Sequence, residues 1–215
     1  MQNKVVKTKK KLRTMETTPV RADKSDLLEV TNIITAEKYV KMINGAIRTI
    51  QDFPREGMFF RDLTTLWKEP EVYQASISAM KLFIEDDFVN IKIAGIEARG
   101  WVYAATLADR MYRPFIAIRK NGVLPANTIT AYYNAEFDDN AIEIHEDAIS
   151  KGDRVILVDD LIATGKTLRA ATKCIERLGG EIIKIVALAD IEKCGGKDYL
   201  RKHGYTTRTV ITYPN

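Results

Sequence analysis

The sequence predicts an α/β fold in which a mainly parallel central sheet is flanked by helices. Short apolar segments rich in Ile and Val alternate along the chain with segments whose apolar residues recur at helical spacing. Strands that alternate with helices in this way are typical of parallel sheets. The chain has 215 residues, 46% of them hydrophobic, which is enough for one domain with a sizeable core.

The first half of the predicted domain begins near Thr35, a candidate N-cap. Helical spacing of apolar residues predicts helices at 35–50, 71–87 and 100–111. Pro54 and Gly57 follow the first helix and end it, because both residues interrupt regular structure. Continuous apolar runs predict buried strands at 91–96 and 114–118.

The second half contains a predicted β-hairpin. Residues 128–137 and 141–144 alternate in polarity and are rich in β-branched and aromatic residues, with a turn at Asp138-Asp139-Asn140. Further apolar runs predict strands at 154–158, 182–191 and 206–212. Helical spacing predicts helices at 167–178 and 198–203, and Gly179-Gly180 is a typical C-cap of the longer one.

Residues 1–30 differ from the rest of the chain and are predicted to be a basic, disordered tail. They carry eight Lys or Arg and four Asp or Glu, so they hold the whole net charge of +4 and leave 31–215 neutral. A targeting peptide is the alternative, because Met1–Thr14 is basic and contains no acid, although it is poor in Ser and Leu. A neutral domain at 31–215 is not expected to bind nucleic acid.

Composition also restricts the cellular compartment and the presence of membrane spans, disulfides and metal sites. No stretch approaches 18 consecutive apolar residues, so no membrane span is expected. Cys174 and Cys194 are too few for a disulfide framework, and His145 and His203 lie far apart, so no metal site built by the protein is expected. The prediction is a cytoplasmic protein in a reducing environment.

The strongest local signal for a functional site is the segment 155–167, whose sequence is VILVDDLIATGKT. A predicted strand ends in Asp159 and Asp160, and a short loop then opens a helix. Ligands of open α/β sheets bind beyond the carboxyl ends of the strands, and a helix N-terminus offers free N–H groups to a phosphate. Paired carboxylates suit vicinal hydroxyls or a metal ion. A sugar phosphate satisfies both halves of the segment.

Two other interpretations of this segment compete with a sugar phosphate site. A Walker P-loop requires a glycine where Asp160 stands, which excludes it. An ordinary strand–turn–helix with a capping acid is the second, because Asp and Thr are common at helix starts. Two consecutive acids followed by Thr164, Gly165, Lys166 and Thr167 favour a binding site over a cap.

The segment resembles the phosphoribosyl-diphosphate signature of the type I phosphoribosyltransferases. Further segments resemble those of the adenine phosphoribosyltransferases, and their order and spacing along the chain agree with that family. These segments are 53–62, 95–100, 118–125, 136–137 and 142–145. The resemblance extends over about residues 35–215. It implies a small N-terminal hood at about 31–66 and a flexible hairpin loop on the α/β domain of 31–215.

The resemblance also implies roles for individual residues. In the hood, Phe60 would stack on a purine while backbone groups of Phe59 and Arg61 contact its edge. The other implied ligands bind phosphoribosyl diphosphate, and they are Glu97, Ala98, Arg99, Gly100, Arg119, Lys120, Asp159, Asp160, Ala163, Thr164, Gly165, Lys166 and Thr167. The family has a cis peptide where Glu97–Ala98 stands. Glu136 would be the catalytic acid beside the base, whereas Glu143 on the same hairpin is expected to matter little.

The implied reaction joins adenine to phosphoribosyl diphosphate and releases AMP and diphosphate. Mg²⁺ would be the cofactor, held mainly by the substrate's diphosphate, and the enzyme would be a homodimer. Two alternatives stay open: a phosphoribosyltransferase for xanthine or hypoxanthine, and a regulator that senses phosphoribosyl diphosphate and uses the basic tail. Without the resemblance, Phe60 is interpreted as a core residue, Arg99 as a solvated loop residue and Glu136 as a polar residue of a hairpin.

The chain departs from the family pattern at several positions. Lys166 stands where a second glycine is usual, so it could strengthen phosphate binding or distort the loop. Val123 replaces a usual Lys that contacts diphosphate, in some members across the dimer interface. Phe137 replaces a common Tyr and Thr106 a common Pro. None of these changes removes Asp159, Asp160 or Glu136.

Overall fold

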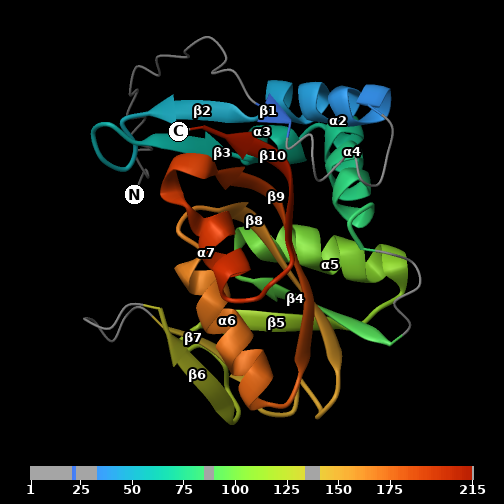
Figure 1. Ribbon diagram of the computed structural model, residues 1–215, viewed down its shortest axis with the longest axis vertical. Coiled ribbons are helices and arrows are strands. Elements are labelled where there is room, and N and C mark those ends of the chain that lie inside the picture. Colours follow the sequence, from blue (N-terminus) through green and yellow to red (C-terminus); the bar gives the residue numbers. More distant parts are fainter. Residues whose placement is uncertain (1–20, 23–32, 85–89, 134–140, 215) are drawn as a thin grey trace, which may run out of the picture.

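A sheet of eight strands is the centre of the described part of the protein, which covers residues 21–22, 33–84, 90–133 and 141–214 of a computed structural model (Figure 1). Its strands, in spatial order, are β1 (Arg21–Ala22), β10 (Thr207–Tyr213), β9 (Glu181–Ile191), β8 (Arg154–Ile162), β4 (Ile91–Ile96), β5 (Phe115–Lys120), β7 (Ala141–His145) and β6 (Thr128–Tyr132). The run from β10 to β5 is parallel, whereas β1, β7 and β6 pair antiparallel with their neighbours. The predicted mainly parallel sheet is confirmed.

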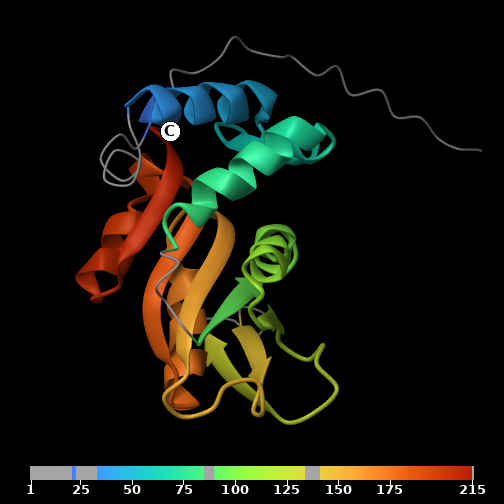
Figure 2. The same cartoon turned by 90° about the vertical axis from the view of Figure 1, so that its right-hand side faces the viewer.

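Helices cover both faces of the sheet, as Figures 1 and 2 show. Helix α5 (Arg99–Met111) packs on one face, and α6 (Lys166–Arg177) and α7 (Gly196–Lys202) lie on the other. The central strands are apolar throughout because both faces are buried. In β8, Ile156 and Val158 face the core around α5, while Val155 and Leu157 face the core around α6.

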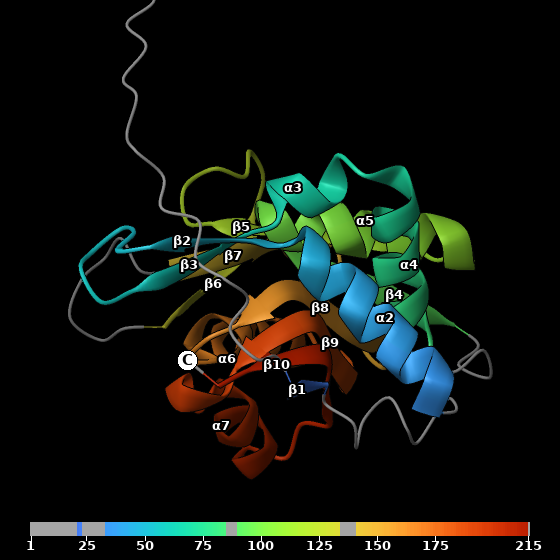
Figure 3. The ribbon, with the colours of Figure 1, turned by 90° about the horizontal axis from the view of Figure 1, so that it is seen from above.

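A separate layer lies over one end of the sheet. It contains α2 (Ile33–Ala46), β2 (Arg48–Gln51), β3 (Phe59–Asp62), α3 (Thr64–Trp67) and α4 (Pro70–Lys81). Strands β2 and β3 form their own two-stranded antiparallel sheet. Figures 1 and 3 show this hairpin beside the C-terminal end of β10. We call β2, β3 and the turn between them the hood hairpin.

The hydrophobic pattern misplaced three element boundaries. The first helix ends at Ala46 rather than at 50, because 48–51 pairs with β3 even though its apolar spacing suits a helix. The second ends at Lys81 rather than at 87, and residues 85–87 lie outside the described part. The strand predicted at 154–158 continues to Ile162, because β9 pairs with it along this length. Asp159 and Asp160 therefore lie within the strand.

The segment predicted as a tail contains one described element. Arg21 and Ala22 pair with Thr212 and Ile211 at the edge of the sheet, so these two residues belong to the sheet rather than to a tail. The rest of 1–30 lies outside the described residues, as does the turn predicted at 138–140. No helix in the described ranges has the length and apolarity needed to cross a membrane.

Candidate active site

The paired carboxylates of β8 lie beside the start of α5, Asp160 buried and Asp159 half-buried. Asp160 is only 4% exposed, and its backbone N–H donates to Oδ1 of Asp159 at 2.9 Å. Gly100 of α5 lies so close that a Cβ there would be 2.6 Å from the same Oδ1. Burial, and then the charge of Asp160, raises the pKa of Asp159 well above its ordinary value. Burial also raises the pKa of Asp160, against the opposing charge of Arg99.

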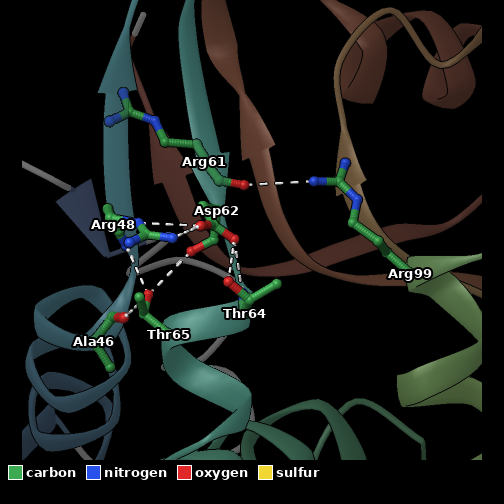
Figure 4. Close-up of polar contacts among 7 residues, drawn as sticks. All are labelled: Ala46, Arg48, Arg61, Asp62, Thr64, Thr65 and Arg99. Carbon is green, nitrogen blue, oxygen red and sulfur yellow. Dashed lines mark hydrogen bonds and ion pairs between the residues drawn. The ribbon is translucent and has the colours of Figure 1, made fainter. Parts of the chain in front are cut away.

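Arg99 connects this acid pair with the hood hairpin. Its Nε lies 2.9 Å from Oδ2 of Asp160, and the two side chains form an ion pair. Its Nη1 donates to the backbone carbonyl of Arg61 at 3.4 Å, and its guanidinium carbon lies 5.4 Å from the centre of the Phe60 ring. Figure 4 shows the Arg61 carbonyl directed at Arg99 while the Arg61 side chain points away. Three segments that are far apart in the sequence therefore meet at one side chain.

A second charged group joins the loop after β4 to the end of β5. Glu97 accepts hydrogen bonds from Nε of Arg119 at 2.8 Å and from the backbone N–H of Lys120 at 2.9 Å. Burial alone would raise the pKa of Glu97, but the bonds from Lys120 and Arg119 hold it below its ordinary value. The Glu97–Ala98 peptide is cis, as the resemblance predicted. Arg119 and Lys120 are thus held beside the loop that carries Arg99.

The loop at 163–165 leads from β8 into α6. Gly165 adopts a left-handed conformation with φ of 74° at the N-cap of the helix, which a glycine adopts without strain. The backbone N–H of Gly196, at the start of α7, donates to the carbonyl of Ala163 at 3.0 Å. A Cβ on Gly196 would lie 2.2 Å from that carbonyl oxygen and 2.7 Å from the nitrogen of Gly165. α7 therefore supports the loop from behind, where any side chain would displace it.

The hood hairpin presents one backbone edge toward Arg99. In an antiparallel pair, backbone groups of alternate residues point to opposite sides of the strand. Because the carbonyl of Arg61 faces Arg99, the backbone groups of Phe59 face the same side. The Arg61 side chain is buried: Nη1 donates to Oγ1 of Thr49 at 2.6 Å, and its guanidinium carbon lies 4.1 Å from the centre of the Tyr213 ring.

The β6–β7 hairpin has a structural carboxylate that the sequence did not reveal. Glu136, the predicted catalytic acid, lies outside the described residues. Glu143 on β7 is 3% exposed, and its Oε1 accepts the backbone N–H groups of Val123 and Leu124 at 2.8 and 2.7 Å. Burial alone would raise its pKa, but these N–H groups, with the N–H of Gly122 and the hydroxyl of Thr128, hold it below the ordinary value. Glu143 therefore holds the backbone of the loop after β5, a structural role that the sequence did not indicate.

Comparison with known proteins identifies the family. Residues 62–212 match the model of the phosphoribosyl transferase domain. An adenine phosphoribosyltransferase from Blochmanniella pennsylvanica is 39% identical over 186 residues, which are 86% of this chain and 100% of the relative. One from Nitrosomonas europaea is 43% identical over 171 residues, which are 80% of this chain and 98% of the relative. The chain belongs to the adenine phosphoribosyltransferase family.

Solved structures of adenine phosphoribosyltransferases share the fold as well. That from Thermoanaerobacter pseudethanolicus is 37% identical, with a TM-score of 0.76 over 81% of this chain and 99% of its own. That from Saccharomyces cerevisiae is 32% identical, with a TM-score of 0.75 over 81% of this chain and 99% of its own. It was solved with adenine and an imino-altritol bisphosphate. This protein is therefore an enzyme of the phosphoribosyl-transfer class.

The structure places two groups of the predicted site residues in contact. Direct contacts join Phe60, Arg61, Arg99 and Asp160, and a second set joins Glu97, Arg119 and Lys120. Sequence reasoning assigned no role to Asp62, Glu143 or Gly196. A weak signal existed for Gly196, since Gly195-Gly196 directly follows an apolar strand and a short polar turn. The contacts of Glu143 are with a loop twenty residues earlier, so the sequence around Glu143 gave no indication of them.

Lys166 does not distort the loop that it enters. The residue that needs a positive φ is Gly165, whereas Lys166 is the first residue of α6 and is exposed. Among the described residues, the non-glycine positions with positive φ are Asp52, Asn90 and Tyr112. The backbone at position 166 therefore accommodates a lysine, where other family members have a second glycine. Its ammonium group adds positive charge at the N-terminal end of the helix.

Changing Gly196 to Ala is expected to weaken binding of the ribose 5′-phosphate. The added Cβ cannot remain 2.2 Å from the Ala163 carbonyl, so the loop must move away from α7. We expect the KM for phosphoribosyl diphosphate to rise at least about tenfold, because a displacement of about 1 Å can cost about 100-fold in rate. Steady-state kinetics and AMP titration of both proteins measure the effect.

Gly45→Ala is the matched control, because no atom lies within 4 Å of a Cβ at that helical position. It should leave both Michaelis constants unchanged and raise thermal stability slightly, since Ala favours helix over Gly. If Gly196→Ala binds AMP as tightly as the control does, α7 does not support the phosphate loop.

Proposed function

We propose that this protein transfers the 5-phosphoribosyl group of phosphoribosyl diphosphate to adenine, producing AMP and diphosphate in purine salvage. The observation that carries the proposal is the position of Arg99, which contacts Asp160 on one side and Phe60 and the Arg61 carbonyl on the other. A ribose bound at the acids and a purine bound at the hood would therefore be neighbours, as formation of an N-glycosidic bond requires.

The sugar phosphate would bind along β8 and the loop that follows it. Asp159 and Asp160 would accept hydrogen bonds from the two ribose hydroxyls, and their charge would favour the positive character that develops at C1. The N–H groups at the start of α6, the hydroxyls of Thr164 and Thr167 and the ammonium of Lys166 would hold the 5′-phosphate. Ala163 and Gly165 contribute backbone groups only.

The leaving diphosphate would lie on the side of C1 opposite the incoming purine, near Arg99, Arg119 and Lys120. When the C1–O bond breaks, its electron pair goes to the diphosphate, and these cations stabilise the added charge. The hydrogen bonds that Glu97 accepts hold Arg119 and Lys120 in place, while Ala98 and Gly100 offer backbone N–H groups at the turn into α5.

We propose Mg²⁺ as the cofactor. The described residues contain no group of three or more His, Cys, Asp or Glu side chains that could hold a metal. The donors that are present fit Mg²⁺, because this ion is usually bound by one or two carboxylates together with substrate phosphates and water. When bound, Mg²⁺ would neutralise charge on the diphosphate.

The purine would stack on Phe60 with its edge against the backbone of β3. A carbonyl such as that of Arg61 can accept a hydrogen bond from the 6-amino group of adenine, but it repels the 6-oxo group of hypoxanthine or guanine. N9 of adenine forms the new bond to C1, and Glu136 would take the proton that the ring loses and pass it to solvent. Closure of the 120–142 hairpin would exclude water, which otherwise captures C1.

Incubation of the protein with phosphoribosyl diphosphate, Mg²⁺ and one purine at a time tests the proposal. We expect AMP and diphosphate to form from adenine, with little product from hypoxanthine, guanine or xanthine, when products are separated by chromatography. Faster turnover of a 6-oxopurine would contradict the substrate assignment. Binding of phosphoribosyl diphosphate without turnover of any purine would instead indicate a regulator.

We also propose that the enzyme is a homodimer, because two-fold dimers are the commonest soluble oligomers and the family places its site beside such an interface. Sedimentation velocity at micromolar concentration checks the assembly, and a fully active monomer would contradict it. We propose that the basic segment at 1–30 is dispensable for activity, apart from Arg21 and Ala22, which pair with β10.

A further inference from the structure

The edge that would bind the purine belongs to a very small sheet. Strands β2 and β3 have four residues each and pair only with each other in the described part of the chain. An isolated hairpin of this kind is marginally stable in water. Its turn is exposed, with Phe53 46% and Met58 49% accessible to solvent. The contacts that fix the position of the edge therefore lie away from this turn, at the buried Arg61 side chain and at the other end of β3.

Asp62 ends β3 and is the centre of a dense hydrogen-bond network at that end (Figure 4). Its Oδ2 accepts Nε of Arg48 at 3.1 Å and also contacts Nη2 of the same guanidinium. Its Oδ1 accepts the backbone N–H of Thr64 at 2.9 Å and the Thr64 hydroxyl at 2.6 Å. Burial alone would raise the pKa of Asp62, but the bonds from Thr64 and Arg48 hold it below its ordinary value. The group is therefore a charged acceptor with four donors.

A second hydroxyl extends the network to α2. Oγ1 of Thr65 donates to the carbonyl of Ala46, the last residue of α2, at 2.6 Å. The same oxygen accepts the backbone N–H of Arg48, the first residue of β2, at 3.1 Å. Figure 4 shows that the contacts of Asp62 and Thr65 together join α2, β2, β3 and α3. The side chains of Arg48 and Asp62 also stand opposite each other in the register of the hairpin.

We infer that Asp62 is a positioning residue for the purine, an inference that rests on the proposed function. It directly follows Arg61, whose carbonyl faces the site. Any movement of Asp62 is transmitted to that carbonyl through a single peptide unit, and hydrogen bonds lose strength steeply with misalignment. The carboxylate has no contact with the phosphate loop or with Asp159 and Asp160 among the described interactions. Its loss should therefore affect the base and not the sugar.

Asp62→Asn tests the inference, since Asn keeps the size and one acceptor but turns an amide donor toward the Arg48 guanidinium. We expect the KM for adenine to rise about tenfold and the KM for phosphoribosyl diphosphate to change less than about twofold, because one charge-assisted hydrogen bond is worth about a factor of ten or more. A general loss of folding would raise both constants or lower the amount of active enzyme. The split between the two constants separates positioning from stability.

Asp52→Asn is the matched control at the exposed end of the same hairpin. Its Oδ1 accepts the backbone N–H of Gly57 at 2.8 Å, and Asn tolerates the positive φ of 57° at this position. Both Michaelis constants should stay at the wild-type values. Equal increases for Asp62→Asn and Asp52→Asn would show only that the hairpin is generally sensitive, and would overturn the inference.

Arg48→Gln keeps the inference testable if Asp62→Asn does not fold. The Arg48 side chain is 40% exposed, so its truncation should leave the domain folded. We expect the same selective increase in the KM for adenine, and no further increase when both changes are combined, because both remove one interaction. An unchanged KM for adenine in Arg48→Gln would refute the role of the pair. Failure of the wild-type protein to use adenine would refute the proposed function itself, and is seen before any variant is made.

Discussion

Replacing Asp159 and Asp160 together with Asn should lower kcat/KM for phosphoribosyl diphosphate by about two to four orders of magnitude. Each hydrogen bond to a charged group is worth about 1.5–3 kcal/mol, or roughly one to two orders of magnitude in kcat/KM. Asn keeps an acceptor oxygen but lacks the negative charge that stabilises the transition state. Steady-state kinetics with phosphoribosyl diphosphate as the varied substrate measures the loss.

The control for this pair is Asp153→Asn, which lies just before the opposite end of the same strand. Asp153 pairs with Lys92 at 2.6 Å, far along β8 from the acids, and a partly exposed ion pair of this kind contributes little. The control should keep wild-type kinetics. If the double variant is folded by circular dichroism and equally active, the two acids serve only to hold Arg99 and the start of α5.

Glu136→Gln should lower kcat by about two to four orders of magnitude, the usual range for a general acid–base group. In the proposed reaction the carboxylate acts only when the purine loses its proton, so the two Michaelis constants should change much less. Gln keeps the size and one acceptor, so the variant isolates the lost charge and proton. Measurements at saturating concentrations of both substrates give kcat directly.

Glu146→Gln is the appropriate control for Glu136, because Glu146 is exposed just beyond β7. Glu143 is unsuitable, since its buried carboxylate holds the backbone of Val123 and Leu124. Loss of that carboxylate would leave buried N–H groups without an acceptor and move the loop next to Lys120. A Glu136→Gln enzyme with near wild-type kcat would remove the catalytic role from Glu136.

Much of the fold could be predicted from the sequence because the central strands are buried on both faces. A continuous apolar run such as 182–191 has few alternatives, and the observed β9 begins only one residue earlier. The boundary at Ala46 could not be predicted in this way. Residues 48–51 fit a helix locally, and only their pairing with β3 makes them a strand.

The site was partly predictable for a related reason. The acids, the glycine loop and the start of α6 are contiguous in sequence, so their spacing indicated a sugar phosphate site. The sequence did not indicate that Arg99 contacts both Asp160 and the Arg61 carbonyl, because this depends on how α5, β8 and the hood hairpin meet. The same holds for Asp62 and Glu143, whose partners lie 14 and 20 residues earlier.

The contact between the hood and β10 has a consequence for synthesis of the protein. The buried guanidinium of Arg61 lies over the ring of Tyr213, whose hydroxyl donates to Asn44 at 3.2 Å across 169 residues of sequence. Residues 33–62 leave the ribosome well before β10, the strand against which they pack. The hood can therefore complete this packing only after β10 has left the exit tunnel. A chain stalled before that point would contain every proposed ligand of the substrate, but the buried guanidinium of Arg61 would lack the Tyr213 ring on which it packs.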